Sequence, residues 1–326
     1  MVLSQIVGMM VQKAKRQDYI SNLSSDLIAQ ALELIQEKSF PVYRKNIHQR
    51  NPPFAHGEFA SAAVAIVLLT AGLDFHLARL KFFRDVAKTK PALPHTPYFN
   101  WNIGTYLYDK IDRLLYKRTE KRLKEQLIEL TAMRDSVAHP KLYLVSSLLR
   151  HDATTSPETA KLVGGESHRA KTLKRKLKRS ERTVSLRLPL VPSWISYVDI
   201  VICVLVLTRF FNLLEERYGN FYSMLGTLPA RDIPSGFFPN WRNTTRKFIT
   251  LADWAQAFFN SLATADQQTV RKRLGFDVSK YIRKRERRRK PKWPKTAEAI
   301  FRAAFELASP PPPEFLKKSP PWKMFP

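Results

Sequence analysis

Arg134 and His139 lie five residues apart, directly before Pro140, and their side chains suit chemistry on RNA. A guanidinium stabilises the negative charge of a phosphate, and an imidazole moves protons near neutral pH. These two groups are enough to cleave an RNA strand without a metal ion. Asp135 follows Arg134 and can pair with a basic neighbour or orient the site. Arg134, Asp135 and His139 are therefore the candidate catalytic residues.

The segment that carries Arg134 has the pattern of an amphipathic helix over residues 119–138, which Pro140 ends. Its apolar residues step by four, three and seven: Leu123, Leu127, Leu130 and Val137. Arg134 falls in the same stripe, where an arginine is costly unless it has a partner or a task. The residue before a proline tends to leave the α conformation, so His139 can turn toward the groove that Arg134 lines. An ordinary helix whose C-terminal histidine interacts with the helix dipole is the alternative.

Other pairings of polar residues are less favourable. Arg50 and His56 have a similar spacing, but two consecutive prolines lie between them, so no helix can hold the two side chains. Asp74 and His76 would lie about 200° apart on a helix, so they cannot both face one site, and we expect them to face solvent. The remaining histidines have no metal-ligand spacing. We expect no metal and no cofactor.

The composition favours an all-α protein. The chain has 326 residues, of which 44% are hydrophobic, and only 10 glycines, and this is ample for a packed core. The hydrophobic pattern predicts helices over residues 24–38, 56–88, 103–116, 119–138 and 194–218, and a further helix after an Asn243 cap. No alternation of polar and apolar residues is strong enough to predict a sheet.

The apolar segments indicate a cytoplasmic protein that does not cross a membrane. The runs 61–73 and 195–207 are shorter than the roughly 20 residues that a span requires, so we expect buried core helices. No secretory signal is visible near the N-terminus. The single cysteine, Cys203, excludes an intrachain disulfide and a cysteine-based metal site, and a reducing compartment is expected.

The net charge of +27 points to a polyanionic partner, most simply RNA or another nucleic acid. Residues 169–187 hold nine Lys and Arg against one acid, and residues 283–295 hold the same numbers. Few aromatic residues accompany these runs, so phosphate attraction is expected rather than base stacking. The candidate nucleic-acid-binding residues are Lys171, Lys174, Arg175, Lys176, Lys178, Arg179, Arg283, Lys284, Arg285, Arg287, Arg288 and Arg289.

The segment around Arg134 resembles the signature of the HEPN superfamily, in which an arginine, a polar residue and three further residues precede a histidine. Arg134, Asp135 and His139 match these positions, with an apolar helix before and another after. The resemblance covers roughly residues 51–218 and implies an up-and-down helical bundle of four or five helices. The basic insertion over 152–192 departs from the family pattern, because it is long for the connection that follows the motif. Residues 1–50 would be a helical extension, and residues 219–326 a helical, basic region with a Pro-rich tail.

Many HEPN proteins are dimeric, metal-independent endoribonucleases of toxin–antitoxin or other defence systems. The resemblance therefore implies a homodimer that cleaves RNA, with His139 as general acid or base, Arg134 on the phosphorane, and a 2′,3′-cyclic phosphate as product. A neutralising, antitoxin-like partner would fit this setting. The alternative is a non-catalytic HEPN-like module that binds nucleic acid or protein, and a basic protein acting at anionic membranes is a more distant reading.

Overall fold

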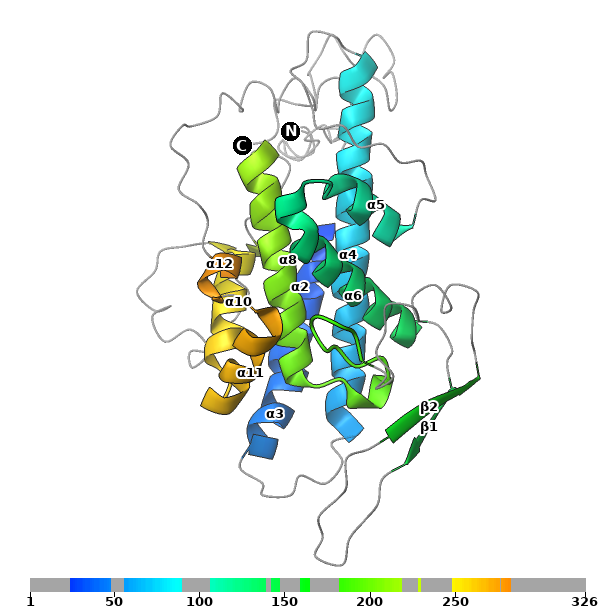
Figure 1. Cartoon of the computed structure of the whole chain (residues 1–326). Coiled ribbons are helices and arrows are strands. Elements are labelled where there is room, and N and C mark those ends of the chain that lie inside the picture. The colour runs from blue at the N-terminus through cyan, green and yellow to red at the C-terminus, as the bar shows by residue number, and fades with distance from the viewer. Residues whose placement is uncertain are drawn as a thin grey trace, which may run out of the picture.

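Long helices packed side by side form the body of the protein (Figure 1). A computed structural model describes residues 24–47, 56–89, 106–138, 142–146, 159–164, 182–218, 228–229, 248–275 and 277–282. Most of these residues are helical, which confirms the predicted all-α class at this level.

The first helical stretch continues past its predicted end at residue 38. Helix α2 (Ser24–Leu34), a π-helical turn η1 (Ile35–Ser39) and α3 (Phe40–Ile47) follow one another without a break. The amide of Phe40 donates to the carbonyl of Ile35, five residues back. This wider turn ends two residues before Pro41, which has no amide hydrogen to donate to a helical carbonyl.

Helix α4 (His56–Thr89) agrees with the predicted range and packs against α2. Gly72 lies where the two helices approach each other. A β-carbon at this position would lie 2.6 Å from Cγ1 of Ile28 and 3.0 Å from the carbonyl oxygen of Ser24. The missing side chain therefore permits the close packing of α2 on α4.

Three further helices complete the bundle. Helix α5 (Leu107–Leu114) and the 3-10 turn η2 (Arg118–Glu120) lead into α6 (Lys121–Ala138), and the turn η3 (Pro192–Trp194) precedes α8 (Tyr197–Tyr218). Helix α6 ends at the residue that the sequence predicts. Helix α8 begins three residues later than predicted, since residues 192–194 form the separate 3-10 turn.

Among the residues that the structure describes, two helical segments are long and apolar enough to cross a membrane, by length and composition alone: Ala60–Ala78 within α4 and Tyr197–Leu214 within α8. In this structure 89% of the α8 segment is buried inside the protein, as the sequence predicts for a core helix. Only 56% of the α4 segment is buried. One side of α4 therefore faces away from the core.

The C-terminal helices α10 (Leu251–Asn260), α11 (Thr264–Leu274) and α12 (Ser279–Ile282) pack against α8. The hydroxyl of Thr250 accepts from the amide of Asp253, and the carboxylate of Asp253 accepts from the amide of Thr250. This capping box fixes the start of α10. The helix thus begins later than an Asn243 cap predicts, and Asn243 lies outside the described residues.

Two short antiparallel strand pairs were not expected from the sequence. Strand β1 (Leu142–Ser146) pairs with β2 (Thr159–Gly164), and β3 (Leu228–Pro229) pairs with β4 (Phe248–Ile249). The β1–β2 pair lies to one side of the helices (Figure 1). It follows α6 in the chain, and β2 belongs to the predicted insertion of residues 152–192.

One hydrophobic core joins the described helices. It contains residues from early and late in the chain, among them Ile28 of α2, Leu127 of α6, Phe210 of α8 and Phe258 of α10. The division into residues 1–50, 51–218 and 219–326 stays a prediction. The described parts of all three regions contribute to the same core.

Candidate functional site

Arg134 lies near the C-terminal end of α6, in the apolar stripe that the sequence predicts. Leu123, Leu127 and Leu130 of this stripe are buried, and Val137 packs against the core. The Arg134 side chain itself keeps 29% of its surface exposed. It therefore lies at the border between core and solvent.

Asp135 is the charged partner of Arg134. Its Oδ1 lies 3.1 Å from Nε of Arg134, and its side chain is 16% exposed. The Nε atom is buried and makes no hydrogen bond within the described structure, so the contact is an ion pair without good hydrogen-bond geometry. The sequence-based expectation that Asp135 pairs with a basic neighbour fits this geometry, and the neighbour is Arg134.

The remaining predicted site residues lie outside the described residues. His139 follows the last residue of α6 and precedes Pro140. The predicted nucleic-acid-binding residues of both basic runs, between Lys171 and Arg179 and between Arg283 and Arg289, also fall outside the described ranges. The structure thus places Arg134 and Asp135 together, and His139 and the basic residues stay predictions.

The expectation that Asp74 and His76 both face solvent is wrong for His76. His76 is buried, and its ring meets the ring of Phe211 on α8 edge-on at 5.0 Å. Asp74 accepts a hydrogen bond from the Lys110 ammonium at 2.7 Å. Packing of α8 against α4 covers His76, an effect of tertiary structure that the helix pattern alone does not contain.

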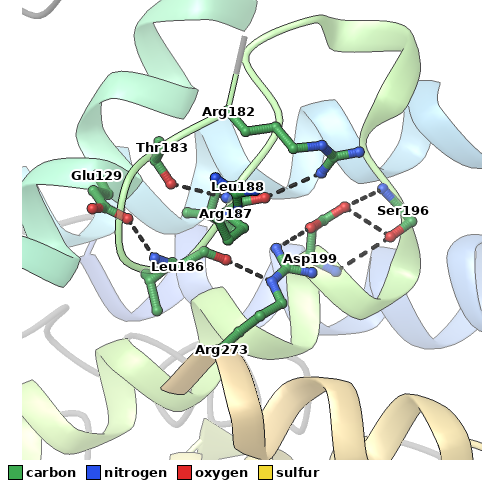
Figure 2. Close-up of polar contacts among 9 residues, drawn as sticks. All are labelled: Glu129, Arg182, Thr183, Leu186, Arg187, Leu188, Ser196, Asp199 and Arg273. Atoms are coloured by element: carbon green, nitrogen blue, oxygen red, sulfur yellow. Dashed lines mark hydrogen bonds and ion pairs between the residues drawn. The ribbon is translucent and has the colours of Figure 1, made fainter. Parts of the chain in front are cut away.

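A polar network missed by the sequence analysis joins three helices through residues 182–196 (Figure 2). Asp199 at the start of α8 is its centre. Its Oδ1 lies 2.5 Å from Nη2 of Arg273 on α11, and its Oδ2 accepts from the amide and hydroxyl of Ser196 at 2.9 and 2.7 Å. Asp199 is 3% exposed and Arg273 is 13% exposed. This buried ion pair fixes α11 to the core helix α8.

The same network holds the loop before α8 against α6. Both carboxylate oxygens of Glu129 accept backbone hydrogen bonds, from the amides of Ser185 and Leu186 at 2.7 Å each. Arg273 also donates through Nε to the carbonyl of Leu186. One short loop is therefore bonded to α6 on one side and to α11 on the other (Figure 2).

The side chain of Arg182, near the end of the first basic run, belongs to this network rather than to an open charged surface, and Arg187 takes part through its backbone carbonyl. Arg182 donates to the carbonyl of Arg187 at 3.1 Å, and its guanidinium lies 5.6 Å from the centre of the Trp194 ring. Burial lowers the pKa of Arg182; the Asp199 carboxylate opposes this shift, and the Arg273 and Arg187 cations add to it. The sequence signal for this network was Asp199, an acidic residue inside an apolar run.

No protein-family model matches the chain, and the comparisons with curated proteins and with solved structures found no match either.

Proposed function

We propose that this chain is a cytoplasmic, metal-independent endoribonuclease of the HEPN type that acts as a toxin or defence effector. The observation that carries the proposal is the position of Arg134. Its side chain is half-buried in the apolar stripe of α6, beside Asp135 and five residues before His139. A cation held at the edge of a core, five residues from a histidine in the sequence, supports a task on a phosphate.

In the proposed reaction, one oxygen attacks the phosphorus and another oxygen leaves it. The ribose 2′-hydroxyl loses its proton and its oxygen bonds to phosphorus, while the bond from phosphorus to the 5′-oxygen breaks. The leaving oxygen takes up a proton, and the products are a 2′,3′-cyclic phosphate and a 5′-hydroxyl. His139 serves as general acid or base in these transfers, and Arg134 stabilises the extra charge of the phosphorane.

Asp135 orients the guanidinium in this proposal. An ion pair between adjacent residues restricts the rotamers of the long arginine side chain, so less freedom is lost when a phosphate binds. The phosphate then competes with Asp135 for the guanidinium. The negative Asp135 also limits binding of anions that cannot make two hydrogen bonds to the fork of the arginine.

A second copy of the chain is the proposed partner, and the outward side of α4 is the surface that supports it. Val64 and Phe75 are exposed there, and Val67, Leu68 and Ala71 between them are half-buried. These residues recur every three or four positions, so they share one face of the helix. A continuous apolar face of this kind is typical of a self-association surface.

The test is cleavage of RNA in excess EDTA, by the wild type and by the Arg134→Ala and His139→Ala variants. We expect both substitutions to lower the rate at least about a hundredfold. Arg44→Ala, which removes an exposed arginine from α3, is the matched control and should cleave at the wild-type rate. Thermal unfolding of each variant checks that the fold is kept. Cleavage that survives in both Arg134→Ala and His139→Ala contradicts the proposal.

A non-catalytic module that binds nucleic acid or protein is the second candidate. The ion pair with Asp135 favours it, because the charge of Arg134 is already compensated without any ligand. This candidate predicts that wild-type protein binds RNA and leaves it intact.

A further inference from the structure

Three tyrosines on and beside α5 expose their rings. Tyr106, at the N-cap of the helix, is 52% exposed, Tyr108 in the first turn is 38% exposed, and Tyr116, two residues after the helix, is 73% exposed. The apolar residues between them, including Leu107 and Leu114, are buried. The core is therefore closed without the tyrosine rings, which lie on its outside.

Two of the rings are arranged as a stack. The ring centres of Tyr106 and Tyr108 lie 6.1 Å apart, and the ring planes differ by 8°. Nearly parallel rings at this spacing offer a flat aromatic surface to a further planar group. Such rings are also rigid, since a tyrosine has only two side-chain torsions, so little entropy is lost when a partner stacks on them.

Three cations follow the third tyrosine in the sequence. Lys117 and Arg118 follow Tyr116 directly, and Lys121 begins α6 one turn later; all three are exposed. Among the described residues no carboxylate pairs with any of the three. These positive charges remain available to a polyanion.

We propose that the tyrosine platform (Tyr106, Tyr108 and Tyr116) and its three cations (Lys117, Arg118 and Lys121) bind single-stranded nucleic acid. The rings stack on bases and the cations hold phosphates, which is the combination that recognises a single strand without reading its sequence. A duplex keeps its bases stacked on one another and cannot use the rings. This site deepens the proposed ribonuclease function, because it would hold the RNA strand that Arg134 acts on. The purpose of the binding rests on that proposed function, whereas the binding itself does not.

The position on α6 fits that purpose. Lys121 and Arg134 lie at opposite ends of the same helix, 13 residues apart, which is about 20 Å at the helical rise of 1.5 Å per residue. A stacked strand covers this distance with about six nucleotides. The same 13 residues turn the helix by about 1300°, so Arg134 lies about 140° round α6 from Lys121. A strand that contacts the tyrosine platform and reaches Arg134 must therefore also pass round the side of α6, which takes more than about six nucleotides.

Binding of a fluorescent 2′-O-methyl oligouridine of about ten nucleotides tests the site. The methyl group removes the attacking hydroxyl, so the assay measures binding whether or not the protein cleaves RNA. Each Tyr→Ala substitution in the platform should weaken binding about tenfold. The matched Tyr→Phe substitutions keep the ring and should bind within a factor of two or so of the wild type.

The cations give a separate readout. The triple substitution Lys117→Ala, Arg118→Ala and Lys121→Ala should reduce the slope of log affinity against log salt concentration by about 2, at about 0.7 for each phosphate contact in a single strand. The tyrosine substitutions should leave that slope unchanged. A fully paired duplex of the same length should not respond to the tyrosine substitutions.

Unchanged affinity in the three Tyr→Ala variants overturns the site, and the exposed rings then belong to a protein contact. An equal loss in the Tyr→Phe variants also overturns it, because stacking needs only the ring. The two proposals fail separately. Normal oligouridine binding without RNA cleavage contradicts the ribonuclease proposal alone. EDTA-resistant cleavage whose rate is unchanged in the Tyr→Ala variants contradicts the tyrosine platform alone.

Discussion

Asp199→Asn tests whether the buried ion pair with Arg273 holds the C-terminal helices on the bundle. The substitution keeps the size of the side chain and removes its charge. In the wild type, one carboxylate oxygen of Asp199 accepts from Arg273 and the other accepts from Ser196. The single carbonyl oxygen of asparagine can face only one of these two residues. Whichever way the asparagine turns, its NH2 group meets a donor, so one of the two interactions is lost.

The cost follows from the burial of both partners. Asp199 is 3% exposed and Arg273 is 13% exposed, so solvent cannot replace the lost carboxylate. Removal of one partner from a buried pair destabilises a protein by about 3–5 kcal/mol. Most domains have a free energy of unfolding of about 5–15 kcal/mol. The Asp199→Asn protein should therefore fold, with a midpoint roughly 10 °C lower or more.

Asp253→Asn is the matched control. Asp253 caps α10 through Thr250 with the same two hydrogen bonds that Asp199 accepts from Ser196, and no arginine pairs with it among the described residues. Its loss should cost about 1 kcal/mol. Urea unfolding followed by tryptophan fluorescence gives both values. Equal losses in the two variants would refute the reasoning, because the pair with Arg273 would then contribute nothing beyond the cap.

Three further predictions concern stability and assembly. Gly72→Ala should lower the free energy of unfolding by about 1–3 kcal/mol in urea, although alanine favours a helix, because its β-carbon would lie 2.6 Å from Cγ1 of Ile28. Burial raises the pKa of the Cys203 thiol above its ordinary value of 9.0, so the unfolded chain releases a proton that the folded protein keeps, and stability falls as the pH rises above 9. Between pH 8 and pH 10, the free energy of unfolding in urea should fall by about 1 kcal/mol more in the wild type than in Cys203→Ala. An identical pH dependence in both proteins would contradict this prediction. Phe75→Asp on the outer side of α4 should convert a dimer into a monomer, measured by light scattering, and an unchanged mass would exclude that face as the interface.

The sequence predicts the elements whose signals are local. Pro140 and the apolar stripe place the end of α6, and the continuous apolar run predicts a buried α8. The partial burial of Arg134 follows from the same stripe. These features depend on spacing within one helix, and spacing is visible in a single chain.

The missed features depend on contacts between distant residues. Arg273 meets Asp199 from 74 positions away, and His76 is covered by α8. Arg182 counts as one more cation in a basic run, yet the fold turns it toward Trp194 and the carbonyl of Arg187. No helical period contains such information, because tertiary packing decides which polar residues are buried.

The ends of the cleaved RNA test the central claim most directly. Labelled RNA is incubated with the wild-type protein in excess EDTA, beside a matched strand with a 2′-deoxy sugar at each cleaved position. Attack by the 2′-hydroxyl, with Arg134 on the phosphorane, predicts a 2′,3′-cyclic phosphate and a 5′-hydroxyl, and an intact deoxy strand. A 5′-phosphate with a 3′-hydroxyl, or cleavage of the deoxy strand, would contradict the proposed ribonuclease.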